Sequence, residues 1–347
     1  MLNETIREIL RKQEDAEFEG KGLVIANSVG TGKNDKPFWN FSVADKSGRL
    51  EAKVWAGKQW IDFRNEEKML AITDPLENIL TQDLVGKVIG FHGKVTKYKG
   101  KNQYDFNKVF ILDQKQHLST EYVQRSEIPD EKLYADFREL IGFCEEPIAG
   151  FLKFVFDEKK GIWSDFKKLP AAYTIHHAYV AGLVEHTVSV AQTAYSMAQA
   201  LENGAYRVNY SLVIAGALLH DLGKIKAYRY EEKKGMVPVV TTEGSFIDHI
   251  PLGYALFESL SRDYNLDNKL KNAIAHIIVS HHGCKEYGSP ALPATPEALV
   301  VSAADDLDFK MFCWKNAVNQ LEDGEEISEI NPFTQRRFWK WEQGNGA

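Results

Sequence analysis

The sequence predicts a two-domain protein in which a small all-β barrel precedes an all-α domain. Two observations support this prediction. Short segments of alternating apolar and polar residues lie between residues 20 and 115, whereas apolar residues recur at helical spacing between residues 136 and 321. A polar stretch containing Pro129 separates the two patterns. We therefore expect an N-terminal arm at 1–19, a barrel domain at 20–115, a linker at 116–135, a helical domain at 136–321 and a C-terminal tail at 322–347.

The composition is that of an ordinary globular protein. The 347 residues suffice for two domains, and 44% of them are hydrophobic. Because no apolar run reaches about 18 residues, we expect no membrane span, and the first residues lack the apolar stretch of a signal peptide. Three widely separated cysteines fit reduced thiols, so we expect a cytoplasmic protein.

The charge is unevenly distributed along the chain. The net charge of −7 argues against broad binding of nucleic acid by the whole molecule. Residues 20–115, however, contain 16 Lys and Arg against 11 Asp and Glu, which is a local charge of +5. An interaction with an anionic polymer would therefore be expected at the barrel domain.

The barrel domain is predicted from its strand pattern. After a short charged helix or arm, we expect five strands, at Gly22–Ala26, Pro37–Val43, Arg49–Trp55, Val85–Val95 and Gln103–Leu112. A helical interlude is expected between the third and fourth strands, at Lys58–Met69 and Pro75–Leu80. Five short strands with a helical excursion inside about 100 residues are typical of an OB-type barrel.

The barrel also carries residues suited to binding a single strand. Four lysines cluster in and beside one hairpin, namely Lys94, Lys97, Lys99 and Lys101. Aromatic residues interleave with these charges, and we take Phe38, Trp39 and Tyr98 as candidates to stack on bases. The alternative is that the aromatic side chains fill the barrel core and that the lysines form a solvated edge.

The second domain has helical periodicity almost throughout. The expected helices are Leu133–Cys144, Ile148–Asp157, Ala178–Leu201, Leu212–Leu219, Pro251–Asp263, Asp267–His281 and Pro296–Asn319. Thr295 is a good N-cap before a proline at the first helical position. Tyr228–Tyr230 and Val237–Val240 are expected to form a small hairpin.

The helical domain is organised around the run Ala217–Lys224, in which an apolar helix ends at His220 and Asp221. The following Gly223 suits the C′ position of a helix. Further candidate metal ligands lie at or near predicted helices, namely His186, His249, His281, His282 and Asp305. A lone histidine on an apolar face is more often a hydrogen-bonded core residue. One metal centre nevertheless explains several buried ionisable groups better than separate exceptions would.

These motifs resemble those of a known superfamily. The segments Gly182–Thr187, His220–Lys224, His281–Gly283 and Ala304–Asp308 look like the HD superfamily of metal-dependent phosphohydrolases. More closely, His176–Thr187 and Ser280–Pro290 resemble the YhaM-type 3′→5′ exoribonucleases, and Phe38–Gly48 and Tyr98–Gln103 are similar to the OB module of that family. The resemblance covers roughly residues 20–320 and implies an OB-fold barrel followed by an HD-domain helical fold.

The resemblance implies a divalent metal centre. It would contain two ions, with Mn²⁺ expected first and Fe²⁺, Zn²⁺ or Co²⁺ as alternatives. Asp221 would bridge the ions beside His220, with His186 and Asp305 completing one shell and the remaining histidines, His249, His281 and His282, completing the other. If His186, His220, Asp221 and Asp305 alone bind, the site is mononuclear.

Two further residues are given roles by this likeness, each with an alternative. Lys224 would neutralise phosphate charge, so we take it with Asp221 as catalytic; the alternative is a lysine favoured at a helix C-terminus. His177 would contact substrate, and core or capping roles are equally open. The chain departs from the family at Ala181 and Asp248, where glycine is common. We expect Ala181 to be tolerated as a methyl group on a helix.

The implied function is exonuclease action on single-stranded RNA, with single-stranded DNA left open as a substrate. Nucleoside 5′-monophosphates would be released one at a time. One alternative is an HD-type phosphodiesterase of a small nucleotide or cyclic dinucleotide, which would leave the barrel surface without a role. A second is a non-catalytic single-strand-binding protein. The expected partner is a nucleic acid, not a membrane, and a homo-oligomeric state is left open.

Overall fold

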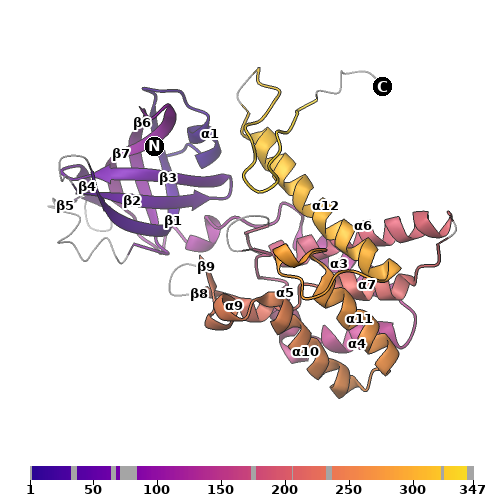
Figure 1. Ribbon diagram of the computed structural model, residues 1–347. Coiled ribbons are helices and arrows are strands. Elements are labelled where there is room, and N and C mark those ends of the chain that lie inside the picture. The colour runs from indigo at the N-terminus through magenta and orange to yellow at the C-terminus, as the bar shows by residue number, and fades with distance from the viewer. Residues whose placement is uncertain are drawn as a thin grey trace. The chain divides into compact units, whose positions relative to one another are not determined.

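The computed structural model describes residues 2–32, 37–63, 68–70, 84–172, 177–204, 206–231, 237–321 and 324–341. The chain divides into two compact units, residues 1–125 with 230–237 and residues 126–229 with 238–347 (Figure 1). Within the described ranges, none of the helices combines the length and the apolar character that a membrane crossing requires.

The first unit is a closed barrel of long strands. They are β1 (Glu17–Thr31), β2 (Pro37–Asp45), β3 (Gly48–Trp55), β6 (Val88–Tyr98) and β7 (Lys101–Ile111). Antiparallel pairing runs in the order β3-β2-β1-β6-β7, and a short parallel pairing of β3 with β7 closes the barrel. The predicted OB-type barrel is confirmed, and the helix α1 (Ile6–Leu10) packs Ile6 and Ile9 into its core.

Aromatic side chains fill the barrel interior. Phe91 stacks on Phe106 with ring centroids 4.3 Å apart, and Phe18 meets both rings edge-on. The hairpin between β6 and β7 turns at Lys99 and Gly100, which both have positive φ. This backbone is that of the two-residue hairpin turn that matches the right-handed twist of strands.

The helix expected at Lys58–Met69 is wrong. The structure places β4 (Gln59–Asp62) and β5 (Lys68–Leu70) in this range, and β4 pairs in parallel with β7. Trp60 and Asp62 of β4 are buried, whereas Gln59 and Ile61 are more accessible, so the segment has the period of a strand. The second part of the expected interlude, Pro75–Leu80, lies outside the described residues.

The second unit is helical. Its early helices are α3 (Asp130–Gly142), α4 (Ile148–Val155), α5 (Ile162–Phe166), α6 (Gly182–Glu202), α7 (Tyr210–Leu219) and α8 (Lys224–Ala227). After the hairpin β8 (Tyr228–Glu231) and β9 (Val237–Val240) come α9 (Thr242–Phe246), α10 (His249–Tyr264), α11 (Asn268–Ser280) and α12 (Pro296–Asn319). The bounds of α12 agree with the prediction, and Thr295 accepts a hydrogen bond from the backbone N–H of Ala298.

Helix α7 lies at the centre of this unit and contacts α3, α4, α6, α11 and α12 (Figure 1). Its apolar residues occur on every side, as expected for a helix buried all round. Gly216 permits the approach of α11, because a Cβ there would lie 2.6 Å from the Ile277 side chain. The end of α7, which carries the histidine–aspartate pair, is thereby held inside the unit.

Candidate metal centre

The predicted metal ligands come together at the ends and inner faces of five helices. His220 caps α7 and Asp221 follows it, His249 is the first residue of α10, and His281 caps α11. His186 and Asp305 lie within α6 and α12. Asp221 is 1% exposed, and the histidines at 186, 220 and 281 are equally inaccessible. Residues up to 119 positions apart in the chain thus share one buried centre.

The first group of donor atoms surrounds the Nε2 atom of His186. This atom lies 3.2 Å from His220 Nε2, 3.3 Å from Asp221 Oδ2 and 3.2 Å from Asp305 Oδ1. Metal–ligand bonds of about 2.1 Å in tetrahedral or octahedral geometry put neighbouring ligand atoms about 3.0–3.5 Å apart. These three spacings fit a coordination shell, whereas the distance of 3.9 Å between His220 Nε2 and Asp305 Oδ1 is longer.

The hydrogen bonds of the two histidines explain why their facing atoms need a cation. His220 Nδ1 lies 2.7 Å from the carbonyl oxygen of Ala217, and His186 Nδ1 lies 2.8 Å from Asp308 Oδ2. A ring nitrogen that faces an oxygen acceptor carries the proton, so in the neutral rings both Nε2 atoms present lone pairs. Two lone pairs 3.2 Å apart repel each other unless a proton or a metal ion lies between them. Burial lowers the pKa of His186, but hydrogen bonds to Asp221, Asp305 and Asp308 raise it well above its usual value, so a proton takes this place when no metal is bound.

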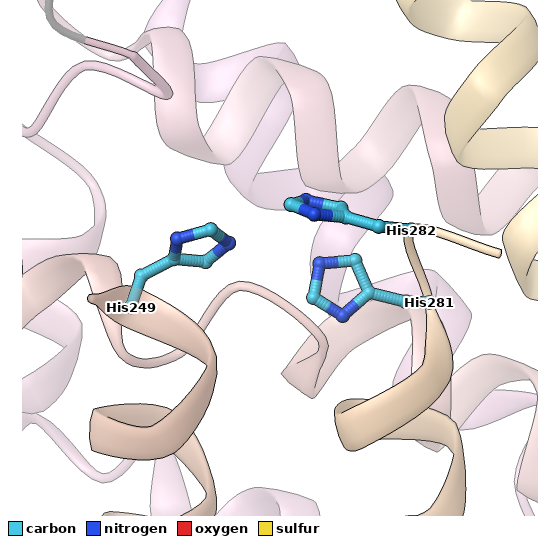
Figure 2. A group of neighbouring side chains, drawn as sticks. All are labelled: His249, His281 and His282. Carbon is cyan, nitrogen blue, oxygen red and sulfur yellow. The ribbon is translucent and has the colours of Figure 1, made fainter. Parts of the chain in front are cut away.

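The second group repeats this arrangement. His281 Nδ1 lies 2.7 Å from the Ile278 carbonyl oxygen, His282 Nδ1 lies 2.6 Å from that of Tyr287, and His249 Nδ1 lies 2.7 Å from Asp248 Oδ1. Figure 2 shows the ring of His249 facing the His281–His282 pair, and the three histidines form one cluster of potential ligands.

Three buried atoms of this second group have no hydrogen-bond partner, namely Asp221 Oδ1, His249 Nε2 and His281 Nε2. Asp221 Oδ1 lies 3.5 Å from His249 Nε2 and 3.8 Å from His281 Nε2. An unpaired buried polar atom is costly, and three that converge are best explained by a shared ligand. The donor set, carboxylate oxygen with imidazole nitrogen, fits a divalent transition metal.

The two oxygens of Asp221 face the two groups. Oδ2 points to the His186 side, and Oδ1 points to the His249 and His281 side. Burial alone would raise the pKa of this carboxyl, but Lys224 and His220 hold that pKa well below its usual range. Burial, with His282 and His220 nearby, holds the pKa of His281 well below its usual range, so that ring is neutral. Ionised carboxylate and neutral imidazole are the forms that bind metal.

Lys224 is 5% exposed and its Nζ lies 2.6 Å from Asp221 Oδ2. It belongs to the single turn of the four-residue helix α8, and its ammonium pairs with the Asp221 carboxylate. The catalytic role of Lys224 and its alternative, a lysine favoured at a helix C-terminus, both stay predictions. Gly223 is not a left-handed C′ residue, because its φ is −67°. A glycine is needed there for another reason: a Cβ would lie 1.9 Å from the backbone oxygen of His249.

Asp308 is a site residue that the sequence analysis missed. Its Oδ2 atom lies close to His186 Nδ1 and 3.1 Å from His177 Nε2. Its Oδ1 atom accepts a hydrogen bond of 2.5 Å from the hydroxyl of Ser189. Its place three residues after Asp305, on the same face of a helix, was the available signal. A carboxylate that holds the far nitrogen of a metal-binding histidine sets both the orientation and the tautomer of the ring.

His177 lies in the same network and is buried. Its Nδ1 lies 2.6 Å from the Tyr179 hydroxyl, and its φ is +47°. Gly182 makes room for this backbone, because a Cβ there would lie 2.0 Å from the carbonyl oxygen of His177. The structure thus supports a core role, and contact with substrate remains a proposal.

Both departures from the family pattern occur at residues with positive φ. Ala181 has φ 64° and precedes the first residue of α6, so it is not a methyl group within a helix as expected. Asp248 has φ 71° and ψ 163°, a region populated almost entirely by glycine. Glycine at these two positions would be free of strain.

The barrel surface differs from the prediction at Trp39. Neighbouring residues on a strand point to opposite faces, so Phe38 and Trp39 cannot share one surface. Trp39 is 1% exposed and packs against Trp60 in the core, so its expected stacking on bases is corrected. Phe38 lies beside Trp55, with ring centroids 4.8 Å apart, and is 9% exposed, so its expected stacking on bases is corrected as well.

Sequence reasoning also missed Lys53 and Trp55. Lys53 Nζ lies 4.6, 5.6 and 5.7 Å from the ring centroids of Phe38, Trp55 and Tyr98. The period-two spacing of Lys53 and Trp55 on β3 was the signal. We call Phe38, Lys53, Trp55 and Tyr98 the aromatic cluster.

The four predicted lysines differ in their surroundings. Lys94 pairs with Asp15 at 2.7 Å and Lys97 with Glu14 at 3.5 Å, whereas Lys99 lies 5.6 Å from the centroid of the Tyr98 ring. Tyr98 is 50% exposed. Lys99 lies in the hairpin turn, and Lys101 follows the turn opposite Tyr98 of the aromatic cluster. This side of the barrel therefore combines an accessible aromatic ring with positive charge.

Comparison with known proteins agrees with this geometry. Residues 183–310 match the HD domain family, which spans the helices that supply the candidate ligands. Residues 183–310 thus match an HD domain, a domain of metal-dependent hydrolases, and the expected resemblance is confirmed.

More particularly, the chain is similar over nearly its whole length to 3′-5′ exoribonucleases YhaM. It is 28% identical over 320 residues to that of Bacillus velezensis and over 321 residues to that of Bacillus subtilis, covering 92% of this chain and 93% of each relative. The YhaM of Listeria monocytogenes serotype 4b is 28% identical over 91% of this chain and 93% of the relative. An OB-fold domain of replication protein A from Methanococcus maripaludis matches 32% of the chain with 12% identity and a TM-score of 0.20, too slight a likeness to support an argument.

Proposed function

We propose that this chain is a metal-dependent 3′→5′ exonuclease of single-stranded RNA that releases nucleoside 5′-monophosphates. The observation that carries the proposal is the convergence of two groups of lone-pair donors on the two oxygens of Asp221. The similarity to YhaM exoribonucleases across both units supports the choice of substrate and direction. Single-stranded DNA is a further candidate substrate.

The chemistry depends on two divalent ions, for which Mn²⁺ is our first choice. When bound, such a pair lowers the pKa of coordinated water and offsets negative charge on a phosphodiester. His186, His220, Asp221 and Asp305 would hold one ion, and Asp221, His249, His281 and His282 the other. We assign residues 20–115 to binding the strand, residues 136–321 to hydrolysis, and the whole protein to the cytoplasm.

The residues around the donors have separate tasks. Lys224 keeps Asp221 ionised and places a positive charge at the buried centre, where a phosphate would arrive. Asp308 holds His186 so that Nε2 points inward. Tyr98 of the aromatic cluster and Lys99 would bind bases and phosphates of the same strand, which makes binding fall as salt rises.

The test of catalysis uses metal-stripped full-length protein, resupplied with Mn²⁺, and single-stranded RNA labelled at its 5′ end. A ladder that shortens from the 3′ end is expected, and Asp221→Ala and Asp305→Asn should abolish it while keeping a cooperative unfolding transition. Strand binding without cleavage in several metals would instead indicate a binding protein. Cleavage of small nucleotides with no binding of RNA would indicate a small-nucleotide phosphodiesterase.

The test of the barrel surface compares long RNA with a chromogenic phosphodiester. Tyr98→Ala with Lys99→Glu and Lys101→Glu should weaken turnover of long RNA and lower the salt dependence by about one unit per lost phosphate contact. Turnover of the small ester should not change. Lys132→Glu, an exposed lysine of the helical unit that pairs with Asp136, is the matched control.

A further inference from the structure

Asp248, next to the metal centre, has a backbone conformation that is unfavourable for a residue with a side chain. Asp248 has φ 71° and ψ 163°, and residues other than glycine are strained there. Its side chain is 68% exposed, so burial of apolar surface does not hold it in this position. Strained residues cluster at functional sites, so the contacts of the Asp248 side chain bear on its role.

The Asp248 carboxylate makes two contacts with the residue that follows. Oδ1 accepts a hydrogen bond from the backbone N–H of His249 at 2.5 Å and lies 2.7 Å from Nδ1 of the same ring. The first contact caps α10, but the second acts on the ring itself. It keeps the proton on Nδ1, and the buried Nε2 atom is left with no hydrogen-bond partner.

The other histidines near this centre are oriented by acceptors from regular structure or from the core. The rings of His220 and His281 are held by carbonyl oxygens three residues earlier, at the ends of their own helices. His249 stands at the beginning of its helix, where no carbonyl of the preceding helical turn is available. The acceptor for its Nδ1 is therefore a side-chain oxygen, that of Asp248. The backbone of Asp248 has a conformation that is usual for glycine.

We propose that Asp248 is a positioning residue: its carboxylate fixes the tautomer and orientation of His249 so that Nε2 is presented to a divalent metal ion together with Asp221 Oδ1 and His281. The inference rests on the metal-dependent function proposed above. The backbone at this position has a conformation that suits glycine. It is strained at Asp248 because the residue there carries the carboxylate that holds His249.

The experiment measures binding of Mn²⁺ alone to the metal-stripped full-length protein, together with the unfolding temperature of the metal-free form. Asp248→Gly removes the backbone strain and the carboxylate together. Loss of the strain should not lower the unfolding temperature, whereas loss of the carboxylate should lower the affinity for Mn²⁺. We expect the metal-free form to unfold at the same temperature as the wild type or higher. The affinity for one of two Mn²⁺ ions should fall about 10–100-fold, the range found when such supporting groups are lost.

Two further variants separate positioning from a purely structural role. Asp248→Asn keeps an oxygen that can accept from Nδ1, so it should recover most of the affinity that Asp248→Gly loses. Ala181→Gly relieves a comparable positive φ and has no bond to a ligand, so its Mn²⁺ affinity should equal that of the wild type.

The outcomes distinguish this inference from the proposed function. Equal Mn²⁺ affinities of wild type and Asp248→Gly would overturn the positioning role alone. A wild-type protein that binds no Mn²⁺, and no other divalent transition metal, would remove the proposed metal-dependent function and the inference with it. An Asp248→Asn variant as weak as Asp248→Gly would show that the oxygen acceptor is not the active feature, and would also overturn it.

Discussion

A methyl group added at Gly223 should disable the metal centre from a position that binds no metal. In Gly223→Ala the new Cβ would lie 1.9 Å from the backbone oxygen of His249 and 2.4 Å from the backbone nitrogen of Gly253. Ordinary contacts of a Cβ begin at about 3.4 Å, so the start of α10 would have to retreat by about 1.5 Å. Backbone atoms are in the way on both sides, and no side-chain rotation relieves the clash.

The size of this displacement sets the expected effect. Metal–ligand distances tolerate changes of about 0.2 Å, so a movement of about 1.5 Å would separate His249 from Asp221. Overpacking typically costs about 1–3 kcal/mol, and we expect the upper end here, a fall of roughly 6–12 °C in Tm for a unit of this size. Loss of the His249-side Mn²⁺ ion should accompany the fall.

The assay combines thermal unfolding of the metal-free protein with Mn²⁺ titration. The matched control is Gly142→Ala, a helical glycine with no atom within 4 Å of the added Cβ. It should be neutral or slightly stabilising, because alanine is the better helix former. Wild-type Tm and wild-type Mn²⁺ binding in Gly223→Ala would refute the reasoning that the α8–α10 contact positions His249.

Three other predictions concern the anchor of His186, the barrel core and acid stability. Asp308→Ala should lower Mn²⁺ affinity about 10–100-fold by titration, whereas Asp306→Ala, which removes a surface pair with Lys310, should not. Phe91→Ala should destabilise the barrel by about 3–5 kcal/mol in denaturant unfolding, because the ring is buried against Phe106; a loss under 1 kcal/mol would contradict the assigned core. Burial keeps the pKa of His281 below its usual value, so the unfolded chain binds the extra proton. Stability from this residue is thus present above about pH 6.5 and lost as the pH falls, and the fall in Tm of the metal-free protein should be smaller in His281→Gln.

Local signals in the chain were enough for many elements. Thr295 and the proline after it mark the start of α12 because capping involves residues within one helical turn. The β6–β7 hairpin follows from a turn in which two adjacent residues take positive φ. The segment around Trp60 was predicted as helix because its partner, β7, lies more than 40 residues away, and such pairing leaves no local signature.

The candidate site likewise contains residues that the sequence predicted and residues that it did not. The residue types and their place near helix ends were readable, because histidine and aspartate in apolar surroundings need a partner. Asp308 was missed because its contacts are with residues 119–131 positions earlier in the chain. Trp39 was misplaced because both faces of β2 carry aromatic residues, and the sequence does not say which face is the core.

By itself, the sequence determined the order of a barrel and a helical domain, the family likeness, and the set of residues able to bind metal. Periodicity, caps and ligand chemistry are properties of single residues and their near neighbours. The tertiary structure alone decided which oxygen of Asp221 faces which histidines, why Gly223 must lack a side chain, and that Asp308 holds the ring of His186. These features depend on distances between helices that meet only after packing, and a shift of about 1 Å there changes the chemistry.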